Sequence, residues 1–246
     1  MTGLMKYLLP LSLIGCSGSS EEAETVDLPV TTAGGAMETA TTDLGYTIEL
    51  SRVRIAVSQI QFTIEGELHE KPGGALPHPG HYAGGEVTGE LPGDFVLEWN
   101  GAAQDDLGTA TLITGDYRGA NFLFRAAAAA DGLDAADPMI GHAFHLTGTV
   151  SKDGITNDLD ILIDTELDTA IVGAVFDDVI GSSTDQRLDI RFFPVDPYEA
   201  ETAFDGVDFA TLPLVGNTVE VRPGTPEHNI IRRTVTTHDH YGVNPE

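Results

Sequence analysis

Alternating apolar and polar residues run through most of the chain and predict β-strands. Apolar side chains occupy every second position over residues 46–50, then over 53–57, and then over 60–64. The apolar phase therefore shifts twice. Since side chains on a strand alternate between its two faces, each shift indicates a bulge or bend in one long, kinked strand.

Residues 66–93 break this alternation completely. The segment contains eight glycines and four prolines, together with three of the eight histidines. A loop of this length inside a compact domain is usually either functional or disordered. We therefore predict a long Gly/Pro-rich loop here.

Strand patterns resume after the loop and continue to the end of the chain. Asp153-Gly154 is a turn pair between two of these patterns and predicts a hairpin. Asp196-Pro197 has the cap and first-turn residues of a helix and predicts a short helix over 197–204. The predicted strands cover residues 95–99, 109–114, 120–124, 142–150, 159–163, 171–176, 188–192, 219–221 and 230–237. Many short strands with one short helix predict an all-β fold, an antiparallel β-sandwich.

The first fifteen residues have the layout of a secretory signal. One positive charge, Lys6, precedes a short apolar run over residues 7–15. The sequence Leu13-Ile14-Gly15-Cys16 then resembles the lipobox of bacterial lipoproteins. That resemblance implies cleavage before Cys16 and a lipid on its sulfur, which would attach the protein to the membrane. The alternative is an ordinary signal peptide with an incidental cysteine.

Beyond the signal, residues 16–25 are polar and small, and we expect a flexible tether. We expect residues 26–246 to form a single β-sandwich domain. Ser17, not Asp, follows Cys16. By the sorting habit of lipoproteins, this favours the outer membrane, with the domain facing the periplasm or the cell surface.

The net charge of the chain limits the classes of partner that can bind it. There are 39 Asp and Glu residues against 12 Lys and Arg, a formal net charge of −27 at pH 7. Such a domain repels nucleic acid and anionic lipid headgroups, so neither is expected to bind the folded part. The acidic residues either form a solvated surface or attract cations, and the charge alone selects no ligand.

Two histidine pairs are the candidate metal ligands. His78 and His81 lie among prolines and glycines that would restrict the loop. His238 and His240, near the end of the chain, share one face if that segment is extended. Imidazole is the commonest protein ligand for zinc and copper, and we predict that the two pairs meet at one divalent ion.

Oxygen ligands and the identity of the ion follow from nearby residues. Glu86 and Asp239 are placed to act as ligands or to orient the imidazoles. Nitrogen and oxygen ligands favour Zn(II) or Cu(II). The alternatives are a solvated loop and a frayed terminus that bind nothing. We expect His142 and His145 to be packed or exposed, and His69 and His228 to lie on the surface.

Three segments also resemble a protein family. Residues 46–53 (Tyr-Thr-Ile-Glu-Leu-Ser-Arg-Val), the turn 115–117 (Gly-Asp-Tyr) and residues 139–142 (Met-Ile-Gly-His) resemble a group of uncharacterised bacterial lipoproteins. Those are similar to the methanobactin-associated (MbnP-like) copper-binding β-sandwich proteins. The likeness covers residues 26–150 loosely and implies periplasmic or surface metal handling. Some relatives use an oxidised tryptophan at copper, but for Trp99 we expect only packing.

These observations favour a non-enzymatic metal-binding lipoprotein that captures Zn(II) or Cu(II), or passes the ion to a metal transporter or receptor. A second hypothesis is an adhesion or carbohydrate-binding β-sandwich without a transition-metal site. A third is a metal-dependent hydrolase, for which Glu86 is the only candidate general base.

Overall fold

The computed structural model of the chain describes residues 24–64, 67–68, 82–83, 86–101, 106–165, 169–183 and 185–246. Most of these residues lie in strands, which confirms the predicted all-β class. The strands are β1 (Thr25–Thr32), β2 (Ala40–Thr41), β3 (Thr47–Ile64), β4 (Glu67–Leu68), β5 (Tyr82–Ala83), β6 (Glu86–Trp99), β7 (Asp106–Ile113), β8 (Gly115–Phe124), β9 (Phe144–Lys152), β10 (Ile155–Ile163), β11 (Ala170–Ile180), β12 (Leu188–Phe192), β13 (Leu214–Val215), β14 (Thr218–Val221) and β15 (Tyr241–Pro245). The helical segments are η1 (Ala129–Asp131), η2 (Phe209–Thr211), α1 (Pro226–Val235) and η3 (His238–His240).

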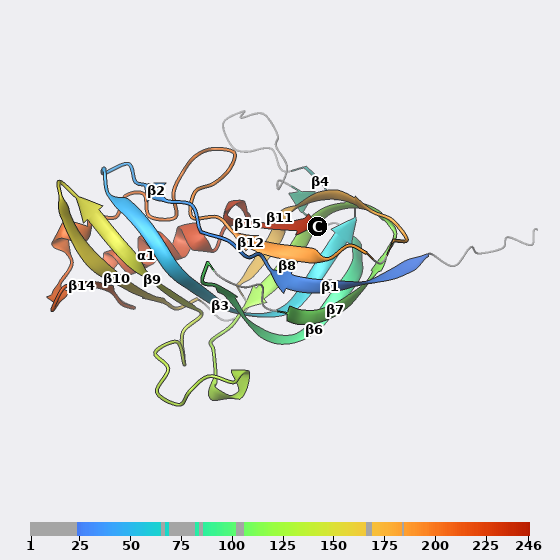
Figure 1. The fold of residues 1–246 in the computed structure, drawn as a ribbon, viewed down its shortest axis with the longest axis horizontal. Coiled ribbons are helices and arrows are strands. Elements are labelled where there is room, and N and C mark those ends of the chain that lie inside the picture. Colours follow the sequence, from blue (N-terminus) through green and yellow to red (C-terminus); the bar gives the residue numbers. More distant parts are fainter. Residues whose placement is uncertain are drawn as a thin grey trace, which may run out of the picture.

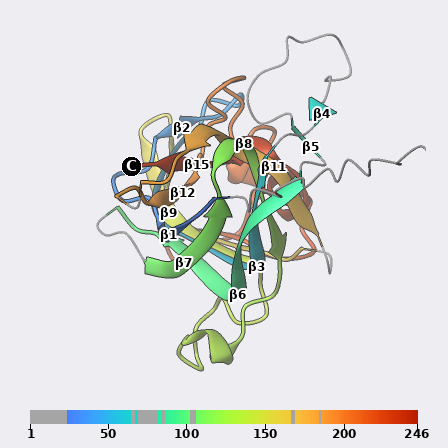
Figure 2. The ribbon, with the colours of Figure 1, turned by 90° about the vertical axis from the view of Figure 1, so that its right-hand side faces the viewer.

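One large sheet holds all the described strands except β4 and β5, which pair with each other. The order β3-β6-β7-β1-β12-β15-β11-β8 closes on itself, because β8 also pairs with β3 (Figures 1 and 2). Facing walls of this closed ring enclose the core in a sandwich-like arrangement. The sheet is mixed and not purely antiparallel, since β1–β12, β10–β14 and β11–β15 are parallel.

Strand β3 organises the sheet because two sets of strands share it. One edge pairs with β6, while the other pairs with β9 along its first half and with β8 along its second half. The β3–β9 register shifts between Leu50 and Arg52, and the β3–β6 register shifts between Ser58 and Ile60. Gln59 between the latter two has a left-handed φ of 54°. Both bulges predicted from the apolar phase are therefore confirmed.

The ring is filled by aromatic and aliphatic side chains from every wall. Tyr117 stacks on Phe176 with ring centroids 5.0 Å apart, and Phe122 meets Tyr241 edge to face at 5.2 Å. Trp99 is buried, and its Nε1–H donates to the carbonyl of Ile190 at 3.1 Å. The packing role expected for this tryptophan is thus confirmed.

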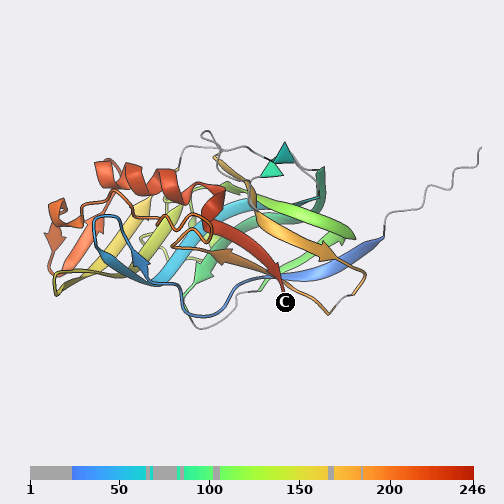
Figure 3. The ribbon, with the colours of Figure 1, turned by 90° about the horizontal axis from the view of Figure 1, so that it is seen from above.

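A wing of four strands, β9, β10, β14 and β13, extends from the first half of β3 (Figure 1). Helix α1 covers its inner face, with Ile231 and Val235 in the core (Figure 3). The helix begins with Thr225, whose hydroxyl accepts from the N–H of His228, and with Pro226 at the first helical position. The strand predicted over 230–237 is therefore wrong, because these start signals precede a segment with one buried face.

The helix predicted over 197–204 is also wrong. Asp196 does accept a hydrogen bond from the N–H of Tyr198 at 2.7 Å, as a capping residue would. The chain then reverses, since Val195 bridges antiparallel to Thr202 and Ala200 has a φ of 58°. The cap residue therefore begins a turn instead of a helix.

The long loop is shorter than predicted, because β6 already begins at Glu86. Gly89 and Pro92 hide this strand in the sequence. A Cβ atom at position 89 would lie 2.7 Å from Cγ of Leu112 on β7, so the close approach of these strands requires glycine. The alternation of apolar and polar residues therefore does not reveal the first part of β6.

Candidate functional site

The tail histidines lie in a helical turn and not in the extended segment predicted. His238 and His240 belong to η3, which follows α1. His240 is buried with 2% of its surface exposed, whereas His238 is partly exposed and its Nε2 lies 3.1 Å from Oδ1 of Asp239. The two imidazoles therefore do not share a strand face, and the geometry predicted for this pair is wrong.

His240 has a defined tautomer. Its Nδ1 lies 2.7 Å from the carbonyl oxygen of Phe193. Since a carbonyl only accepts, Nδ1 carries the proton and Nε2 carries the lone pair. Burial lowers the pKa of His240 below its ordinary value of 6.5, so the ring is neutral at pH 7. Histidines that bind metal ions usually donate their other ring N–H to a carbonyl or carboxylate in this way, which fixes the orientation of the ring.

His240 lines a cavity of about 240 Å³ whose other charged residues are mostly acidic. Asp196 is 4% exposed, and Oδ1 accepts from the N–H of Tyr198. The lining residues are Asp196, Glu199, Glu201, Arg233, Thr234, Thr237, Asp239 and His240. Among the described residues, no three His, Cys, Asp or Glu side chains form a group that could hold a metal ion. This cavity therefore provides candidate metal ligands, but not a complete coordination set.

The other predicted ligands are distributed as follows. Glu86 is exposed at the start of β6, where it pairs with Ile64 of β3. His78, His81 and the proposed lipidation site Cys16 lie outside the described residues. Strand β5, which begins directly after His81, lies against β11, and η3 lies against the same strand. Strand β5 and η3 therefore both contact β11.

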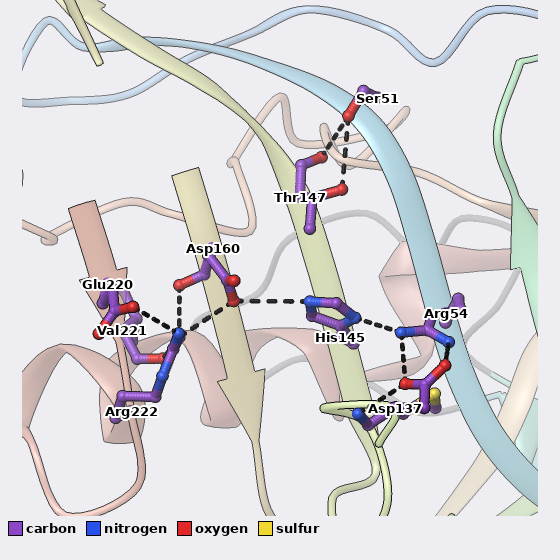
Figure 4. A network of polar contacts seen from close by, with 10 residues as sticks. Ser51, Arg54, Asp137, His145, Thr147, Asp160, Glu220, Val221 and Arg222 are labelled. Atoms are coloured by element: carbon purple, nitrogen blue, oxygen red, sulfur yellow. Dashed lines mark hydrogen bonds and ion pairs between the residues drawn. The ribbon is translucent and has the colours of Figure 1, made fainter. Parts of the chain in front are cut away.

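A row of polar and charged residues that the sequence pattern did not predict lies on the outer face of the wing (Figure 4). Arg54 on β3 is 2% exposed and makes a bidentate pair with Asp137, with N–O distances of 2.6 and 2.9 Å. Met139 in the same loop packs against Ala56 of β3 and Ala127. The segment before β9 is thus fastened to the outer face of β3. The hydrogen bonds from Arg54 lower the pKa of Asp137 to about 2.

His145 on β9 continues this row. It lies directly opposite Arg54, whose guanidinium donates to its Nδ1, which leaves Nε2 to carry the ring N–H. Nε2 faces Oδ1 of Asp160 at 3.5 Å, a weak contact. Arg222 donates to the same carboxylate oxygen at 3.1 Å and pairs with Glu220 at 3.0 Å. A row of polar contacts thus connects β3, β9, β10 and β14.

This row serves the structure of the wing. Its central residues, Arg54 and His145, are buried, and both terminal nitrogens of Arg54 contact side chains of the row. Among the described residues, Nε of Arg54 and Nε2 of His145 have no hydrogen-bond partner. The sequence signal for this row is the set of polar positions on β3 that alternates with Val53 and Ile55. Alternation places Arg52 and Arg54 on one face of the strand. It does not identify which residues of other strands lie beside them.

The remaining histidines form a second small cluster. Nδ1 of His142 contacts Oδ1 of Asp164 at 2.5 Å, and the backbone N–H of Asp164 donates to Nε2 of His228 at 3.1 Å. His228 is 3% exposed, so its predicted surface position is wrong, because it faces the sheet from α1. The burial of His145 confirms that it is a packed histidine, and His69 lies outside the described residues.

Comparison of the chain with protein-family models, with curated proteins and with solved structures finds no significant match. Within the described parts of the chain, none of the helices has the length and apolar character needed to cross a membrane.

Proposed function

We propose that this protein is a lipid-anchored metal-binding protein that captures Zn(II) or Cu(II) outside the cytoplasm and hands the ion on. The proposal rests on the position and protonation state of His240. Its ring is buried and neutral, its Nδ1–H is fixed on the carbonyl of Phe193, and it lines an acidic cavity. Such a ring needs no deprotonation before Nε2 binds an ion.

The cavity supplies oxygen ligands beside this nitrogen. Asp196 is the most buried of the carboxylates there, and Asp239 is adjacent to His240 in the chain. Two ligands do not complete a tetrahedral site, and we propose that His78 and His81 supply further nitrogens. The position of β5 and η3 against the same strand, β11, supports this pairing of loop and tail.

The role proposed is binding and transfer, with a transporter or receptor as the partner. The net charge of −27 favours approach of cations from solution and disfavours anionic surfaces. The lipid on Cys16 would keep the protein at the membrane, where such a partner resides. With two or more acyl chains, a lipoprotein anchor is stable, whereas a single chain binds reversibly.

The metal site is tested by calorimetric titration of the mature domain with Zn(II), Cu(II) and Ca(II). We expect His240→Gln to weaken transition-metal binding at least tenfold, and Asp196→Asn and the double variant His78→Ala/His81→Ala to weaken it as well. The matched control is His228→Gln, which replaces a buried histidine outside the cavity. Wild-type affinity in His240→Gln, with its fold confirmed by circular dichroism, would refute the site.

The anchor is tested separately by membrane fractionation of bacteria that express the full chain. We expect Cys16→Ser to release the protein from the membrane fraction and to abolish labelling with radioactive palmitate. Continued membrane association and labelling of Cys16→Ser would contradict lipidation and leave the metal proposal untouched.

A further inference from the structure

A second cavity lies at the far end of the wing and takes no part in the metal proposal. It measures about 300 Å³, the lower end of the range for small-molecule sites. The hairpin β9–β10, η2 and the β13–β14 hairpin surround it. Its lining consists of Tyr46, Val150, Lys152, Asp153, Ile155, Asn157, Phe209, Ala210, Leu214 and Val219.

We infer that this cavity binds a small amphipathic anion: a molecule with one aromatic ring or a short branched chain, and a carboxylate head that pairs with Lys152. Buried core side chains, including Tyr46, Phe209 and Val219, face the cavity, whereas Ile155 and Leu214 at its edge are 66% and 57% exposed. A water molecule in such a cavity finds few polar partners. An apolar body therefore suits it better than solvent.

Lys152 determines the charge of the ligand. It is the only lysine among the residues that the structure describes. Its Nζ donates to the carbonyl of Leu44 at 2.8 Å and lies 4.4 Å from the ring centroid of Tyr46. An ammonium group has three N–H donors, so two remain for a ligand. The contact with Tyr46 also occupies the ring face on which a cationic ligand would bind.

Two carboxylates near the cavity do not reverse this preference. Oδ1 of Asp208 accepts hydrogen bonds from the hydroxyl of Tyr46 at 2.5 Å and from the N–H of Ala210 at 3.2 Å, so it is already engaged. Asp153 lies on the exposed turn of the β9–β10 hairpin. Asp153 therefore opposes an anion from the exposed edge of the cavity, where solvent screens its charge. Its removal should strengthen binding.

The experiment compares three probes that share one body: 4-phenylbutyrate, 4-phenylbutan-1-ol and 4-phenylbutylamine, each titrated into the full domain by calorimetry. We expect the acid to bind best and the amine worst. Lys152→Met should remove the advantage of the acid over the alcohol, about fivefold for an exposed ion pair. Asp153→Asn should increase the affinity for the acid.

A mutation at the edge of the cavity locates the binding site. Leu214→Asp should weaken all three probes, and since Leu214 is exposed, the variant should fold. The control Val172→Asp replaces another exposed apolar residue, outside the cavity lining, and should leave binding unchanged. Equal affinities for the acid, the alcohol and the amine, or the highest affinity for the amine, would overturn the inference. So would the absence of binding, or a dimer in sedimentation equilibrium that Leu214→Asp dissociates, since the cavity would then be a contact between copies.

Discussion

The pair Arg54–Asp137 allows a quantitative test of how the outer face of the wing is held. We consider Asp137→Asn, which keeps the shape of the side chain and removes its charge. Arg54 has only 2% of its side chain exposed and Asp137 has 16%, so the charges are shielded from solvent. A neutral partner leaves the guanidinium buried without a compensating charge.

The cost follows from the pKa of Asp137. A carboxyl whose pKa falls from 3.8 to about 2 on folding contributes about 2 kcal/mol to the stability of the protein above both values. Asp137→Asn should therefore lower the free energy of unfolding by about 2 kcal/mol at pH 7. Asp137→Ala also removes the acceptor atoms and should cost about 3–5 kcal/mol.

The sign of the pH dependence is fixed because the folded pKa is the lower one. The contribution of Asp137 is present above about pH 4 and is lost as the pH falls through about 2. Urea unfolding, followed by the fluorescence of the single tryptophan, should show a gap between wild type and Asp137→Asn that closes over this range.

The exposed pair Arg118–Asp177, with side chains 34% and 41% exposed, provides the control. Asp177→Asn should cost less than about 1 kcal/mol. A gap below about 0.5 kcal/mol for Asp137→Asn at pH 7, or a gap that persists at pH 2, would refute the argument for a buried, charge-dependent contact.

Further predictions concern single contacts. Thr225→Ala removes the N-cap of α1 and should cost about 1 kcal/mol in chemical denaturation. Gly148→Ala would place Cβ 2.1 Å from the carbonyl oxygen of Glu49, and we expect a loss of more than about 2 kcal/mol in the same assay. Tyr241→Phe removes a hydroxyl that donates to the carbonyl of Val235 at 2.6 Å; a loss of about 1–2 kcal/mol is expected, with the lowered melting temperature as its measure.

Local patterns in the chain predicted what depends on neighbouring residues. The phases of β3 and its two bulges follow from alternation, because a strand presents successive side chains to opposite faces. The Asp153-Gly154 turn is also confirmed, because Asp and Gly tolerate the left-handed φ angles of 52° and 79° that these residues adopt. Asp196 accepts the backbone hydrogen bond that a helix cap would accept, but the helix predicted after it is wrong, because the chain reverses there.

Tertiary structure alone decided which distant residues meet. The closure of β8 on β3, the pair Arg54–Asp137 and the cavity around His240 join segments far apart in the chain. Alternation states which face a side chain occupies, but it cannot state which strand lies beside it. The sequence by itself therefore determined the class of the fold and the charge of its surface, whereas strand pairing selected which charged groups are buried together, because burial depends on neighbours that only the folded chain supplies.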